Sequence, residues 1–159
     1  MSSTVPLRKD IPVEHTWGAE SIFADDAAWS AEFEAVSKDL SSLAKFKGHL
    51  GDSSETLAKW FAESEAIRIR AGKVTLYASL RYSVDTTDQI AVALNDRGRG
   101  LAARVASAVS FEEPELLAIG FERLRSWMSQ EPHLRIYAHY LDRLEKRAAH
   151  VRSAEVEEL

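Results

Sequence analysis

Apolar residues recur at intervals of three and four along most of this chain, which is the spacing of one face of an α-helix. Glycine and proline are scarce, with seven and four copies in 159 residues. The pattern predicts an all-α fold, a bundle of about five amphipathic, mostly antiparallel helices over residues 25–150. Residues 1–24 are expected to form an irregular lead-in, because Pro6 and Pro12 oppose helix formation there.

Each predicted helix begins at a residue suited to a helix start. Pro114 and Pro132 suit the first turns of the fourth and fifth helices, and Gly98 and Gly100 are interpreted as sites of close helix packing. Capping side chains precede the first three helices: Asp25 or Asp26, Ser53 or Ser54, and Thr87 or Asp88. The expected buried stripes are Trp29, Phe33, Val36, Leu40 and Leu43; Leu57, Trp60, Ser64, Ile67, Ala71, Val74 and Ala78; Ala91, Leu94, Gly98, Leu101, Val105 and Ala108; Leu117, Phe121, Leu124 and Met128; and Leu134, Tyr137, Leu141, Leu144 and Ala148.

Composition excludes several classes of function. The net charge of −5 opposes nucleic-acid binding, which normally requires a basic excess. The sequence has neither the long apolar run of a membrane span nor a signal peptide, so we expect a cytoplasmic protein with no membrane partner. The absence of cysteine excludes disulfides and thiolate catalysis.

No catalytic, cofactor-binding or metal-ligating residue is predicted. The histidines lack both the His-Glu-x-x-His spacing of a zinc hydrolase and the Glu-x-x-His spacing of a di-iron bundle. His139 and Asp142 could form half of a metal site, but an exposed histidine beside a carboxylate is the preferred interpretation. The segment "GRGLAA" matches a loose dinucleotide motif without the preceding strand that the motif requires. The basic residues Arg143, Lys146, Arg147 and Arg152 are interpreted as a solvated helix end.

Five segments occur in an order and spacing that resembles the N-terminal region of oligoendopeptidase F, a bacterial member of the thimet-oligopeptidase-like zinc metallopeptidases. They are "RKDIPVEHTWGAESIFADDAAWSAEFEAV", "FKGHLGDSSETL", "YASLRYSVDTTD", "SFEEPELLAI" and "YAHYLDRLEKRAAHVRSAEVEEL". The resemblance implies a helical N-terminal domain that forms one wall of a deep channel, where the complete enzyme hydrolyses short peptides.

The same resemblance implies that catalysis belongs to another part of the enzyme. In the family, zinc is held by His-Glu-x-x-His and a downstream glutamate, beyond the length present here, so zinc is a cofactor of the full-length family only. This chain is therefore expected to be inactive alone, and its expected partner is the missing catalytic region or subunit. Family-like residues without a chemical role are possible domain contacts: Trp17, Tyr82, Asp85, Thr86 and His150.

The last residues, 151–159, resemble the start of a helix that continues in the family. Ser153 can cap it, and glutamates crowd its first turn. We interpret this segment as the start of a truncated helix, which in the family continues toward the catalytic part. The apolar surface left uncovered could also support self-association.

Two alternatives to the peptidase domain remain open at the level of sequence. One is a stand-alone, non-enzymatic helical module for interaction or dimerisation. The other is an independent metal-dependent enzyme using His139 and its neighbours.

Overall fold

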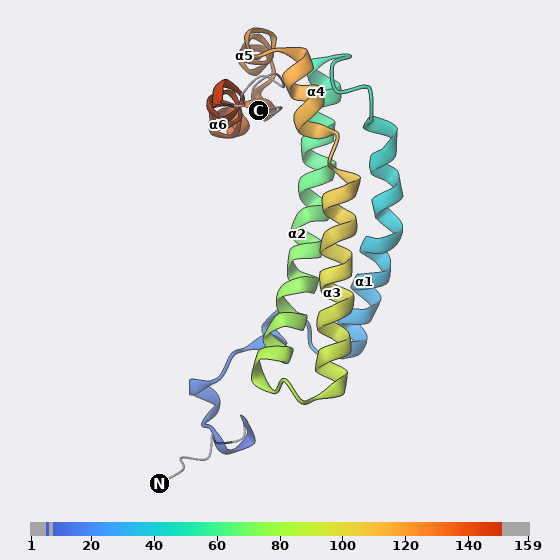
Figure 1. Ribbon diagram of the computed structural model, residues 1–159, viewed down its shortest axis with the longest axis vertical. Coiled ribbons are helices and arrows are strands. Elements are labelled where there is room, and N and C mark those ends of the chain that lie inside the picture. Colours follow the sequence, from blue (N-terminus) through green and yellow to red (C-terminus); the bar gives the residue numbers. More distant parts are fainter. Residues whose placement is uncertain (1–5, 7, 151–159) are drawn as a thin grey trace, which may run out of the picture. The chain divides into compact units, whose positions relative to one another are not determined.

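The fold is all-α, as predicted, in the part of the chain that the computed structural model describes, namely residue 6 and residues 8–150 (Figure 1). The lead-in contains the short 3₁₀ helices η1 (Arg8–Asp10), η2 (Val13–His15) and η3 (Ala19–Ser21). The remaining elements are α1 (Asp26–Asp39), η4 (Leu40–Phe46), α2 (Ser54–Val84), α3 (Gln89–Ala108), α4 (Glu112–Ile119), α5 (Phe121–Gln130), η5 (Pro132–Tyr137) and α6 (Ala138–His150). None of the described helices is long and apolar enough to cross a membrane.

The chain divides into two compact units. Unit 1 comprises Met1–Asp39 and Ile67–Val105, and unit 2 comprises Leu40–Ala66 and Ala106–Leu159. Helix α2 contributes its C-terminal part to unit 1 and its N-terminal part to unit 2. The predicted division into lead-in, bundle and truncated helix stays a prediction, and residues 151–159 lie outside the described part of the chain.

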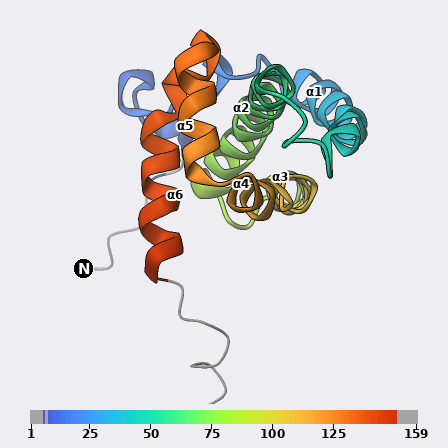
Figure 2. The same ribbon diagram turned by 90° about the horizontal axis from the view of Figure 1, so that it is seen from above.

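In unit 1, α1, α2 and α3 lie side by side (Figures 1 and 2). Trp29 of α1 is fully buried, and its Nε1 donates a hydrogen bond of 2.8 Å to the carbonyl oxygen of Val74. Arg70 of α2 binds Glu32 and Asp39 of α1, each through an N–O contact of 2.6 Å. A buried indole with a satisfied N–H and a guanidinium shared by two carboxylates therefore hold α1 against α2.

Helices α2 and α3 approach closely at Gly98. A Cβ atom added there would lie 3.3 Å from the Cβ of Ala78 and 3.5 Å from the Cα of Thr75. The interpretation of Gly98 as a packing residue is confirmed. The same interpretation of Gly100 is wrong, because Gly100 is exposed and a Cβ there would meet nothing within 4 Å.

Leucine at these two glycines is expected to have opposite effects on stability. In G98L the added side chain must force α2 and α3 apart, and we expect the free energy of unfolding to fall by about 2 kcal/mol. In G100L the side chain points to solvent and improves helix propensity, so a gain of roughly 0.5–1 kcal/mol is expected. Urea denaturation followed by circular dichroism measures both variants, and equal losses would contradict the assigned helix contact.

In unit 2, the core is built around Trp60 of α2. The rings of Phe46 and Phe111 lie 5.6 and 4.8 Å from its ring, centroid to centroid. The carboxylate of Glu115 accepts hydrogen bonds from the backbone N–H groups of Gly48 (2.6 Å) and Leu50 (3.1 Å). These contacts fasten the loop before α2 onto α4.

The predicted fourth helix is two helices. Gly120 has a φ of +84°, in the left-handed region that ends helices, and it separates α4 from α5. The predicted stripe is wrong before this break, because Leu117 is 44% exposed and its neighbour Leu116 is buried instead. Beyond the break, Leu124 is buried as predicted.

The predicted helix starts agree with the structure where a side chain caps the backbone. Asp25 accepts a hydrogen bond from the N–H of Ala28, Ser53 from Thr56, and Asp88 from Ile90. Pro132 begins η5, which leads directly into α6, and Figure 2 shows α5 and α6 next to each other in unit 2. Core positions of this last segment are buried as predicted: Leu134, Leu141 and Leu144.

Candidate domain-contact site

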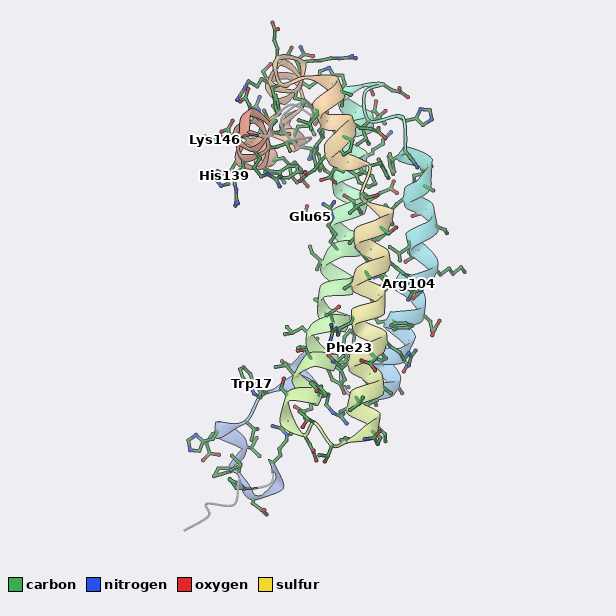
Figure 3. All side chains as sticks on the ribbon, viewed as in Figure 1. Trp17, Phe23, Glu65, Arg104, His139 and Lys146 are labelled. Carbon is green, nitrogen blue, oxygen red and sulfur yellow. The ribbon has the colours of Figure 1, made fainter. Side chains whose placement is uncertain are left out.

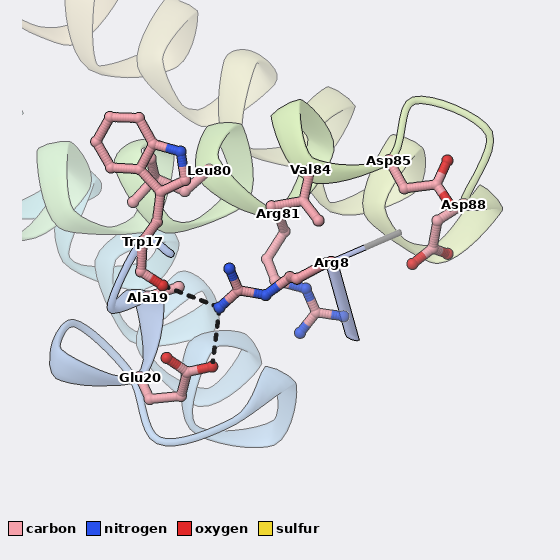
Figure 4. A pocket seen from close by; sticks show the side chains of 9 residues that line it. All are labelled: Arg8, Trp17, Ala19, Glu20, Leu80, Arg81, Val84, Asp85 and Asp88. Atoms are coloured by element: carbon pink, nitrogen blue, oxygen red, sulfur yellow. Dashed lines mark hydrogen bonds and ion pairs between the residues drawn. The ribbon is translucent and has the colours of Figure 1, made fainter. Parts of the chain in front are cut away.

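A pocket of about 280 Å³ lies in unit 1, where the lead-in meets the end of α2 and the turn that follows it (Figure 4). Its lining combines exposed apolar groups with charges of both signs. The lining residues are Arg8, Trp17, Ala19, Glu20, Leu80, Arg81, Val84, Asp85 and Asp88.

Arg8 orders the lead-in side of the pocket. Its Nη2 donates a hydrogen bond of 2.9 Å to the carbonyl oxygen of Trp17 and lies 3.8 Å from the carboxylate of Glu20 (Figure 4). The Trp17 side chain is 63% exposed, although Ala19, two residues later, is buried. The lead-in thus presents an aromatic surface that no described contact buries.

Asp85 shapes the turn between α2 and α3. Its Oδ1 accepts hydrogen bonds from the Thr87 hydroxyl (2.7 Å) and the Thr87 backbone N–H (2.8 Å). These two bonds, led by the hydroxyl, hold the pKa of the Asp85 carboxyl below its usual value. Asp88, three residues later, caps α3. Both carboxylates therefore have a local structural role.

Arg81 lines the pocket and also belongs to a hydrogen-bond network with Asp26 and Tyr77. Its Nη1 lies 2.8 Å from Oδ1 of Asp26, which also accepts a 2.8 Å hydrogen bond from the Tyr77 hydroxyl. Burial, followed by the hydrogen bond to Asp26, raises the pKa of Tyr77 above its ordinary value. The Tyr77 phenol stays protonated and a donor at neutral pH.

The structure brings together two of the predicted domain-contact residues. Trp17 and Asp85 line the same pocket, and Thr86 is exposed in the adjoining turn. Tyr82 is half-buried on α2, next to Arg81. The backbone of His150 ends α6 in unit 2, and its side chain lies outside the described part of the structure.

Sequence reasoning missed one buried polar residue, Glu112. It is 5% exposed and accepts hydrogen bonds from Trp60 Nε1 (2.8 Å) and the Tyr140 hydroxyl (2.7 Å). Trp60 and Tyr140 are 52 and 28 residues away from Glu112 in sequence. No local pattern signals such contacts, because Glu112 and Glu113 look alike at the start of a helix.

The residues present do not fit a zinc ion. Among the residues that the structure describes, no group of three histidine, aspartate or glutamate side chains could hold a metal. The Asp142 carboxylate, which the sequence offered as half of a metal site with His139, instead accepts a 3.0 Å contact from Arg125. The ionisable groups that line the pocket of unit 1 are carboxylates and guanidinium groups, and Glu20, Asp85 and Asp88 each have a local partner.

Comparison with known proteins matches this chain to peptidases. A family model described as oligopeptidase F matches residues 115–159. Over 158 residues the chain is 32% identical to oligopeptidase PepF of Bacillus subtilis, covering 99% of this chain and 24% of that protein. Over 152 residues it is 30% identical to the group B oligopeptidase PepB of Streptococcus agalactiae, covering 96% of this chain and 25% of that protein.

Solved structures show the same fold. The crystal structure of oligoendopeptidase-F from Enterococcus faecium has a TM-score of 0.73 and 28% identity, covering 84% of this chain and 26% of that chain. A putative peptidase from Chlamydophila abortus also has a TM-score of 0.73, at 22% identity, and covers 98% of this chain and 26% of that chain.

The chain spans about a quarter of the length of the curated relatives it matches. Nearly the whole chain aligns with a part of oligopeptidase PepF, and 84% of it is covered by the structural match to a solved oligoendopeptidase-F. The chain is an N-terminal domain of the oligoendopeptidase F family.

Proposed function

We propose that this chain forms one wall of a peptide-binding channel in an oligopeptidase F-type enzyme and has no peptidase activity by itself. The observation that carries the proposal is an alignment of 99% of the chain with only 24% of a peptidase. Within that alignment the chain's own sequence contains no His-Glu-x-x-His motif. Its contribution is to shape the channel and restrict access to short peptides, and a cytoplasmic setting is part of the proposal.

The chemistry of hydrolysis is assigned to the rest of the enzyme. A zinc ion supplies an activated water in such a peptidase when it is bound, and no residue described here is assigned to hold it. The residues of this chain instead form helices that build the proposed wall of the channel.

We further propose that the pocket of unit 1 contacts the remainder of the enzyme. Trp17 is large, aromatic and exposed, and exposed residues of this type are enriched where proteins meet. Asp85 and Thr86 lie on the turn beside this pocket, and hydrogen bonds between Asp85 and Thr87 already order the turn. Little conformational entropy is therefore lost when the turn contacts the rest of the enzyme. Tyr82 and His150 stay in the proposed contact set as sequence predictions.

Absence of activity is tested with the purified chain, zinc and a quenched fluorescent peptide. We expect no increase in fluorescence above a heat-treated sample. Chelator-sensitive turnover that survives a second purification would refute the proposal that catalysis lies elsewhere. A bacterial oligopeptidase F, assayed with the same peptide, serves as the positive control.

The alternative of a stand-alone interaction module makes a different prediction about the gene. A reading frame that continues past the codon for Leu159, or that lies beside a second frame encoding His-Glu-x-x-His, supports the peptidase domain. An isolated frame supports the module.

A further inference from the structure

An exposed isoleucine marks an unusual surface on unit 2. Ile136, near the end of η5, is 74% exposed. It lines two separate hollows of about 460 and 450 Å³. Ile136 therefore borders both hollows and is largely exposed to solvent. A single exposed apolar side chain is common on protein surfaces, so what distinguishes Ile136 is the charge of the residues that line the two hollows beside it.

The first hollow has an acidic rim. Three carboxylates line it, those of Glu55, Glu65 and Glu131, against a single lysine, Lys59. Lys59 lies 2.7 Å from Glu55 and so neutralises that carboxylate. Glu131 accepts a hydrogen bond from the backbone N–H of His133, and within the described part of the chain it pairs with no cation.

The second hollow has a basic rim on the other side of Ile136. Besides Ile136, it is lined by four residues of α6, namely His139, Tyr140, Arg143 and Arg147. Figure 3 shows His139 and Lys146 on this helix. Arg147 forms an ion pair of 2.6 Å with Glu113. Arg143 is exposed, and none of the described carboxylates forms an ion pair with it.

We propose that two copies of this chain pair through the Ile136 surface about a twofold axis. A twofold axis places the same patch of both molecules face to face, so a stable patch must complement itself. An apolar centre with a negative rim on one side and a positive rim on the other meets this condition. Ile136 then packs against Ile136 of the second copy, and each acidic rim faces a basic rim.

Because the whole molecule is negatively charged, the charged residues around Ile136 determine in which orientation two copies can attract one another. Each copy carries a net charge of −5, so two copies repel one another in most orientations. The twofold arrangement brings the Glu131 carboxylate of each copy to the Arg143 guanidinium of the other. Charge complementarity of this kind selects one orientation among many. This pairing goes beyond the proposed channel wall and does not depend on it.

The apolar centre is tested by sedimentation velocity over a range of concentrations. The unaltered chain is expected to dimerise reversibly, and Ile136→Glu should weaken the dimer at least tenfold. Ile90→Glu is the matched control, because Ile90 is also exposed but lies on α3 of unit 1. A chain that stays monomeric at every soluble concentration, or equal effects of both variants, would overturn the proposal.

Charge reversal tests the orientation. Glu131→Arg and Arg143→Glu should each weaken the dimer at least tenfold, because each homodimer then contains two like-charge contacts. An equimolar mixture of the two variants should recover a dimer, since one cross-contact is native and the other is reversed but still attractive. Recovery also shows that both variants fold. Variants that dimerise normally by themselves, or a mixture that stays monomeric, would contradict the twofold arrangement.

Discussion

Replacing Trp60 with alanine is expected to lower the free energy of unfolding by about 3–5 kcal/mol. Trp60 is completely buried in unit 2 and packs against the rings of Phe46 and Phe111. Removing the indole leaves a cavity that its neighbours can fill only in part, and it removes a buried hydrogen bond that Glu112 accepts.

Urea denaturation monitored by circular dichroism measures this loss. Trp17→Ala is the matched control, because the same substitution on an exposed indole should change stability by no more than about 0.5 kcal/mol. A loss below about 1 kcal/mol in Trp60→Ala would mean that the packing around this ring is far looser than the ring distances indicate.

The second large effect is expected at Glu112. In Glu112→Ala, the Trp60 N–H loses its acceptor in the core, and a buried donor without an acceptor costs about 1–3 kcal/mol. The Tyr140 hydroxyl also loses this acceptor, but it is half-buried beside a hollow where water can replace the bond. The free energy of unfolding should therefore fall by about 1–3 kcal/mol. Glu112→Gln should recover part of this loss, because the amide oxygen can still accept from one donor.

The adjacent residue supplies a control for Glu112. Glu113 has the same side chain and helix position within one residue, but it is exposed and forms a surface ion pair with Arg147. Glu113→Ala should cost no more than about 1 kcal/mol. Similar losses in the two alanine variants would show that the buried hydrogen bonds of Glu112 contribute little to stability.

Local signals in the sequence predicted the helices because helix formation depends on neighbouring residues. The caps at Asp25, Ser53 and Asp88 act over two or three residues. The apolar spacing of the stripes is equally local and correctly predicted buried residues such as Trp29 and Leu101. The sequence also offered the family resemblance, since that depends on order and spacing along the chain.

The failures occur where a position depends on what lies across from it in space. Gly98 lies on the predicted apolar stripe and Gly100 does not, and only Gly98 comes close to α2. Leu117 fits the helical period, but its neighbour Leu116 is the buried residue of α4, and that helix ends at Gly120. The error at Leu117 comes from running one helical period through Gly120, where the structure has two separate helices.

The sequence by itself determined the all-α class, the helix starts and the absence of a His-Glu-x-x-His motif, because each depends on residues a few positions apart. Only the tertiary structure decided that Trp17 and Asp85 share a pocket, that Glu112 is buried and hydrogen-bonded to Trp60 and Tyr140, and that Ile136 borders one hollow lined mainly by acidic and one lined mainly by basic side chains. These juxtapositions join residues brought together by chain folding and helix packing, and no spacing along the chain encodes them.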